Sequence, residues 1–135
     1  MISDDIKRLK RLKRNLIPEK QEDCARFLRL AEGGAISYDR VGSSGSDENR
    51  QAQKNDEYVA ACEELEELKA ECTALMYHLT AEINSVFADD DEKRRIAKLH
   101  YVDGVTLNAI ASKHMHYSYG CVKNKNAEIA AYLNL

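Results

Sequence analysis

A regular repeat of apolar side chains between residues 58 and 86 is the feature that most constrains this fold. Positions at alternating steps of four and three residues are Tyr58, Cys62, Leu65, Lys69, Cys72, Met76, Leu79, Ile83 and Val86, and all but Lys69 are apolar. Leu68 lies next to Lys69 and can partly replace the apolar side chain that the seam lacks there. Such a seam over about four heptads predicts a long helix that packs lengthwise against a second helix.

An N-terminal helical arm over residues 3–32 is one candidate for that second helix. Its apolar residues recur every three or four positions from Ile2 to Leu16, and Lys and Arg occupy the other faces, which is typical of an amphipathic basic helix. We expect Pro18 to kink or restart this helix. A short apolar stripe then runs from Cys24 to Ala31, and Gly33-Gly34 should end the arm.

Residues 33–55 are rich in Gly, Ser and polar side chains, which predicts a flexible connector ordered only near Ile36, Tyr38 and Val41. The long helix then pairs either with the arm of its own chain or with a second subunit, and the sequence is compatible with both. Its acidic face is interpreted as solvated surface and consists of Glu63, Glu64, Glu66, Glu67 and Glu71. Matching this face to the basic start of the arm slightly favours an intermolecular partner, because folding back places it opposite the arm's C-terminal part.

The composition agrees with an all-α fold of one small domain and an appendage. The chain has 135 residues, of which 32% are charged and 7% aromatic, with no Trp and one Pro, a balance that favours charged helices over a β fold. Its four cysteines are widely spaced, and we expect them to act as small apolar side chains without disulfides. No apolar run approaches the roughly 20 residues of a bilayer span, so a cytoplasmic protein without a membrane partner is expected.

The pattern of the C-terminal 45 or so residues predicts three short helices. Residues 89–91 are all Asp and can cap a helix that continues to Val102, and Asp103-Gly104 ends it. Thr106 can cap a second helix ending near His114, and Ser118 can cap a third that reaches about Leu133. This spacing is typical of a helix-turn-helix DNA-binding domain. We therefore divide the chain into a helical hairpin or coiled coil at 1–87 and a helix-turn-helix at 88–135.

This segment resembles region 4 of sigma-70-type transcription factors. The resemblance rests on residues 99–104 (LHYVDG), Ile110-Ala111, Tyr117-Ser118 and Val122. The preceding arm, the loop containing residues 37–41 (SYDRV) and the acidic helix extend the likeness over almost the whole chain. Together they resemble small phage and prophage proteins related to the ArpU and RinA type of late-gene regulators, which implies transcription control of phage late or packaging genes.

The turn between the second and third helices holds one residue more than the usual pattern. In one alignment Ile110 and Ala111 keep their usual buried places and His114 points inward. In the other, Met115 fills that core position and Ala111-Ser112 take the place of the pair. We prefer the second alignment, because an inward neutral His requires a hydrogen-bond partner and an inward Met does not.

Docking into a DNA major groove requires polar and cationic side chains near the start of the last helix. The candidates for reading base edges there are Tyr119, Lys123, Asn124 and Asn126. Those better placed for backbone phosphates are Lys113, Tyr117 and Ser118. Residues 93–135 carry seven Lys or Arg and two Asp or Glu, so the segment can attract DNA. A competing interpretation places Asn126 in the core, because it shares a stripe with Val122 and Ile129.

The expected function is therefore sequence-specific binding of double-stranded DNA to regulate transcription. The coiled coil would supply homodimerisation or a contact to RNA polymerase. No nucleophile set, phosphate-binding loop or ligand cluster is apparent, so we expect no catalytic residue, metal or cofactor. Two alternatives remain: a small terminase subunit that recognises packaging DNA, and a protein-interaction module with a degenerate helix-turn-helix.

Overall fold

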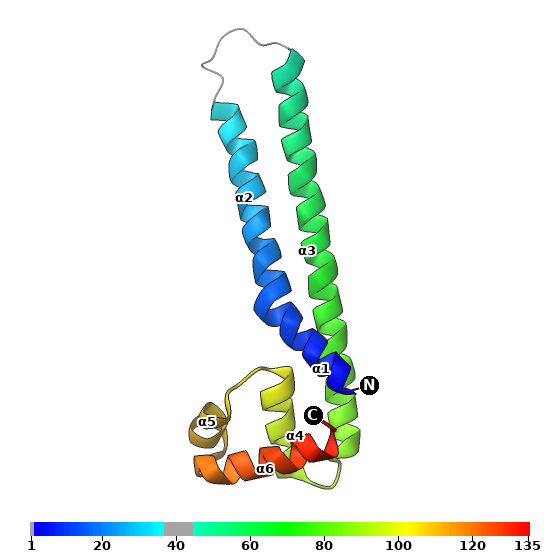
Figure 1. Ribbon diagram of the computed structural model, residues 1–135, viewed down its shortest axis with the longest axis vertical. Helices are drawn as coiled ribbons and strands as arrows, with labels where there is room; N and C mark the ends of the chain where they lie inside the picture. The colour runs from blue at the N-terminus through cyan, green and yellow to red at the C-terminus, as the bar shows by residue number, and fades with distance from the viewer. Residues whose placement is uncertain (1, 37–44) are drawn as a thin grey trace. The chain divides into compact units, whose positions relative to one another are not determined.

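The computed structural model describes residues 2–36 and 45–135 of the chain (Figure 1). Within these ranges all regular structure is helical and no strand occurs, which confirms the all-α prediction. None of the helices described is long and apolar enough to cross a membrane. The predicted ordered positions Tyr38 and Val41, with the rest of residues 37–41, lie outside the described residues.

Contacts divide the chain into two units that differ from the predicted division at residue 87. One unit comprises Met1–Arg11 together with Cys72–Leu135, and the other comprises Leu12–Glu71. The long helix α3 (Gly45–Val86) contributes its first part to the second unit and its last turns to the first. The C-terminal helices therefore share a unit with the end of α3 and with the start of the chain.

In the unit Leu12–Glu71, a π-helical turn η1 (Leu12–Leu16) leads into α2 (Ile17–Ile36). Pro18 lies just after this turn and has no N–H to donate to a carbonyl one turn earlier. The predicted kink or restart at Pro18 coincides with this change from π-helical to α-helical structure, and the chain stays helical through it. The predicted end at Gly33-Gly34 is wrong, because α2 continues to Ile36.

The predicted connector is also too long, because α3 already begins at Gly45. Residues 46–57 contain no Pro or Gly. Once the seam beyond residue 58 fixes a helix, extension backward adds one hydrogen bond for each residue ordered, which is far easier than starting a new helix. A polar segment can therefore continue a helix that it would not nucleate.

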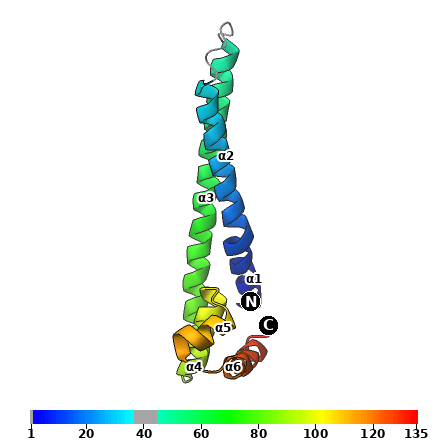
Figure 2. The ribbon, with the colours of Figure 1, turned by 90° about the vertical axis from the view of Figure 1, so that its left-hand side faces the viewer.

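Helices α2 and α3 lie side by side and antiparallel within the single chain (Figures 1 and 2). An ion pair between Lys20 and Glu64 joins the two helices. The contact buries Cys24, Ala31 and Ala61. Four members of the acidic face of α3 are exposed and the fifth is half-buried, as predicted for solvated surface: Glu63, Glu64, Glu66 and Glu67 are exposed, and Glu71 is half-buried.

The other unit holds α1 (Ile2–Arg11), the end of α3, α4 (Asp91–Ala97), η3 (Lys98–Val102), α5 (Leu107–Ala109), η4 (Ile110–Met115) and α6 (Tyr119–Tyr132). Helix α6 packs against α4, α5 and η4, and α1 packs against η3. The largest fully buried side chains here are Leu9, Leu79, Ile83, Ile96, Ile110, Val122 and Ile129. The predicted last seam position is wrong, because Val86 is exposed. Phe87, which directly follows α3, is buried instead, with its ring 5.6 Å from that of Tyr132.

Candidate nucleic-acid interface

Helix α6 begins at a side-chain cap, as the sequence predicts. The Ser118 Oγ accepts a hydrogen bond from the Cys121 N–H at 3.2 Å, which satisfies one of the free donors of the first turn. Val122 and Ile129 are completely buried on one side of the helix, and Leu133 follows them. The predicted inward orientation of Val122 is confirmed, and the opposite side of α6 faces solvent.

The turn before α6 contains the residues of the two competing alignments. Ile110 and Ala111 are both buried, Ser112 is exposed, and His114 and Met115 are half-buried. The second alignment, which moves the buried pair onto Ala111-Ser112, therefore disagrees with the observed burial. The segment instead forms the π-helical turn η4, and such a turn accommodates one extra residue within a helix.

His116 ends η4 in the left-handed conformation, with φ 54° and ψ 38°. The Tyr117 N–H then donates to the Ala111 carbonyl at 2.9 Å. This geometry is that of a helix C-terminus, where Gly is usually preferred because a Cβ is unfavourable at positive φ. The turn therefore has a defined backbone conformation that directs the chain into α6.

Glu92 of α4 holds the start of α6 by two contacts. Its Oε1 accepts a hydrogen bond from the Tyr117 hydroxyl at 2.7 Å, and its Oε2 lies 2.7 Å from Lys125 Nζ. The hydrogen bond with Lys125, followed by that with Tyr117, lowers the pKa of Glu92. The same carboxylate raises the pKa of Tyr117 and of Lys125. These contacts connect residues 25 or more positions apart and fix the N-terminal turns of α6 relative to α4.

Asn126 makes an internal hydrogen bond. The Tyr101 hydroxyl donates to Asn126 Oδ1 at 2.8 Å, and Asn126 is half-buried. Burial raises the pKa of Tyr101, so its hydroxyl remains a donor at neutral pH. This arrangement matches the competing interpretation, in which Asn126 belongs to the core stripe, and leaves it less available for a DNA base.

The other predicted contact residues are exposed. Lys113 lies on η4, and Tyr117 and Ser118 lie at the turn. Tyr119, Lys123 and Asn124 lie on the first two turns of α6, with 48% of Tyr119 accessible. Tyr119 and Lys123 are four positions apart and therefore share one face of the helix. Tyr117 keeps its hydroxyl on Glu92, so only its ring is available for an external contact.

No protein-family model, curated protein or solved structure matches this chain.

Ion pairs within the unit reduce the free positive charge around α6. Three of the seven cations of residues 93–135 pair with carboxylates: Lys93 with Glu128 at 2.9 Å, Arg94 with Asp91 at 2.6 Å and Lys125 with Glu92. Arg95, Lys113 and Lys123 are exposed and lie outside these pairs.

Sequence reasoning missed Arg95, which lines a shallow hollow of about 360 Å³ beside the turn. The other lining residues are Asp91, Glu92, His114, Met115, His116 and Tyr117. Arg95 belongs to α4 and is exposed, so a cation lies beside the turn although it comes from an earlier helix. The run of basic residues at 93–95 was the available signal, but the sequence does not show which of the three stays unpaired.

Proposed function

We propose that this protein binds specific sequences of double-stranded DNA through a helix-turn-helix formed by residues 88–135, with α6 as the recognition helix. The observation that carries the proposal is the exposed, unpaired group of Tyr119, Lys123 and Asn124 on the first turns of a helix whose opposite side is buried. Asn can bond adenine in a bidentate manner, and Lys can reach guanine acceptors or phosphate.

The proposed role is regulation of transcription, of phage late or packaging genes as the sigma region 4 resemblance implies. Lys113, Ser118 and Arg95 would contact phosphates and position α6 without reading the sequence. The α2/α3 pair would provide a contact to RNA polymerase or to a second copy. A dimer predicts an operator with two half-sites about 10 base pairs apart or a multiple of that distance.

The test is fluorescence anisotropy with a labelled DNA duplex of random sequence, measured over a salt series. We expect wild-type affinity to fall steeply with salt, because binding releases counterions from the phosphates. Lys123→Ala should bind more weakly, and its salt slope should be shallower by about one unit if Lys123 contacts a phosphate. The matched control is Lys69→Ala, which also removes one positive charge but from exposed α3, where Lys69 pairs with Glu66 at 3.7 Å.

Absence of binding at low salt, or equal losses for Lys123→Ala and Lys69→Ala, would contradict the proposal. The second candidate function is then a protein-interaction module. The ion pairs of Lys93, Arg94 and Lys125 favour it, because they leave a smaller positive field than the sequence suggests. The terminase alternative is tested by measuring the mass of the assembly in solution. A terminase ring contains many copies of the chain, whereas a regulator usually contains two.

A further inference from the structure

Two cysteines from distant parts of the sequence meet across the α2/α3 contact. Cys24 on α2 is buried and Cys62 on α3 is half-buried, and both thiols are free. The two side chains lie close enough to interact, and Tyr58 lies close to Cys62 as well. The ion pair between Lys20 and Glu64 lies within about one turn of them on each helix and is consistent with the same antiparallel register.

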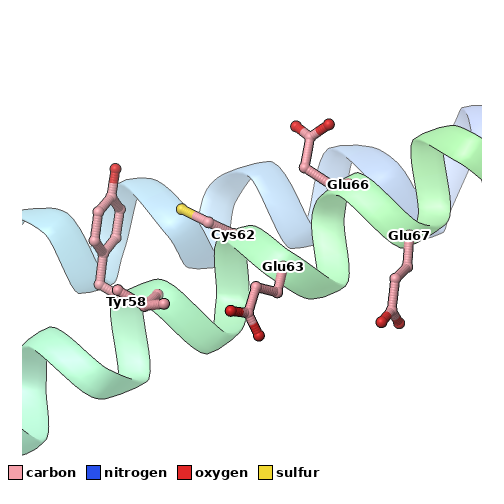
Figure 3. Close-up of a pocket in the computed structure, with 6 residues that line it drawn as sticks. Tyr58, Cys62, Glu63, Glu66 and Glu67 are labelled. Carbon is pink, nitrogen blue, oxygen red and sulfur yellow. The ribbon is translucent and has the colours of Figure 1, made fainter.

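Cys62 is the accessible member of this pair. It lines an open hollow of about 450 Å³ with Tyr58, Val59, Glu63, Glu66 and Glu67. Figure 3 shows the Cys62 sulfur directed toward α2, whereas Glu63 and Glu67 point away from it. Burial, followed by the hydrogen bond with Cys62, raises the pKa of the Cys24 thiol. Cys62 is therefore the thiol that a reagent from solvent reaches first.

We propose that Cys24 and Cys62 form an oxidant-sensitive dithiol, which a peroxide converts into an intrachain disulfide between α2 and α3. The Cys62 thiol releases its proton, the thiolate attacks a peroxide oxygen and the O–O bond breaks; a sulfenic acid forms, and the departing hydroxide takes up the released proton as water. The Cys24 sulfur then attacks the Cys62 sulfur, the S–S bond forms, and the departing hydroxide takes the Cys24 proton as water. Two thiols and one hydrogen peroxide thus give one disulfide and two waters.

The surrounding charge selects the class of oxidant. Glu63, Glu66 and Glu67 are exposed around the hollow and give it a negative potential. An anionic thiol or disulfide reagent is repelled by this field, and a neutral peroxide is not. A thiolate, and not a thiol, attacks a peroxide, so the reaction becomes faster as the pH rises.

The experiment treats the purified full-length protein with hydrogen peroxide at about pH 8 and follows intact mass and the peptides released by proteolysis under non-reducing conditions. We expect a loss of about 2 Da, the mass of two hydrogen atoms, and a linked peptide pair containing Cys24 and Cys62 within a monomer. Dithiothreitol should reverse both changes. The link should disappear in Cys24→Ser and in Cys62→Ser and persist in the matched control Cys121→Ser, whose cysteine lies on α6 in the other unit.

The wild-type peptide pair decides the proposal even if a variant fails to fold. Oxidation that adds oxygen to Cys62 without linking it to Cys24 would overturn it, as would links involving Cys121 instead. A Cys24–Cys62 link between two chains would also overturn it, because the helix pair would then be exchanged between subunits. None of these outcomes depends on DNA binding.

Discussion

The two units of this chain bury their apolar side chains to very different extents. Seven of the eight largest fully buried side chains belong to the unit of Met1–Arg11 and Cys72–Leu135, and Leu12 is the eighth. Exposed large apolar side chains occur in both units, for example Leu30 at 47% and Leu135 at 46%, so the difference lies in the fully buried ones. Several helices that converge can enclose a side chain from all directions, whereas two helices side by side cover only one strip of each other.

A regular heptad pattern therefore does not by itself ensure that the side chains of the seam are fully buried. The seam of α3 runs through both units with Lys69 as its one polar position, yet Leu79 and Ile83 are fully buried and Leu65 is half-buried. The number of neighbouring helices decides how much of the surface of each seam side chain is shielded from solvent. We therefore expect most of the folding free energy to come from the unit that contains α6.

The largest expected effect is on stability, and it tests the difference in burial between the two units. Ile129→Ala should lower the free energy of unfolding by about 2–5 kcal/mol, because it opens a cavity in a fully enclosed site. The matched substitution Leu65→Ala, at a half-buried seam position, should cost roughly 1 kcal/mol. Urea unfolding followed by circular dichroism measures both, and equal losses would contradict the comparison.

A smaller effect is expected from Tyr101→Phe, which removes the hydroxyl that donates to Asn126. The loss of this part-buried hydrogen bond should cost about 0.5–1.5 kcal/mol in the same unfolding assay. Affinity for random-sequence DNA should stay at the wild-type value, because Asn126 acts in the core. A large loss of DNA affinity at unchanged stability would instead show that the orientation of Asn126 matters for binding.

The contacts of Glu92 predict a pH dependence confined to the unit of α6. Its pKa in the folded protein is lowered from the ordinary value of 4.5, so its stabilising contribution is present above that value and is lost as the pH falls through the folded pKa. The difference in Tm between wild type and Glu92→Gln should therefore be largest near pH 7 and shrink toward pH 3. A difference that stays constant over this range would rule out ionisation of Glu92 as its source.

The smallest effect is expected on the exposed face of the helix pair. Leu30→Gln keeps a good helix former at a position that is 47% exposed, so the free energy of unfolding should change by no more than about 0.5 kcal/mol. Unfolding measured at several protein concentrations shows whether the effect involves a second chain. A loss above about 2 kcal/mol that depends on concentration would show that a second chain covers Leu30.

Much of the local structure was readable from the sequence. The predicted caps Thr106 and Ser118 accept hydrogen bonds from the backbone N–H three residues later, and Asp90 does the same for α4. The buried position of Val122 was also predicted. These features depend on residues within one or two turns, and such neighbours are fixed by chain connectivity.

Tertiary structure alone decided the contacts between distant residues. The pairing of Tyr117 and Lys125 with Glu92 and of Tyr101 with Asn126 depends on how α4, η3 and α6 pack. The tertiary structure also decided which cations near α6 lie outside ion pairs and that Cys24 lies close to Cys62. A sequence determines where helices form through local hydrogen bonding and apolar periodicity. The geometry in which their side chains meet follows only from the packing of the whole unit.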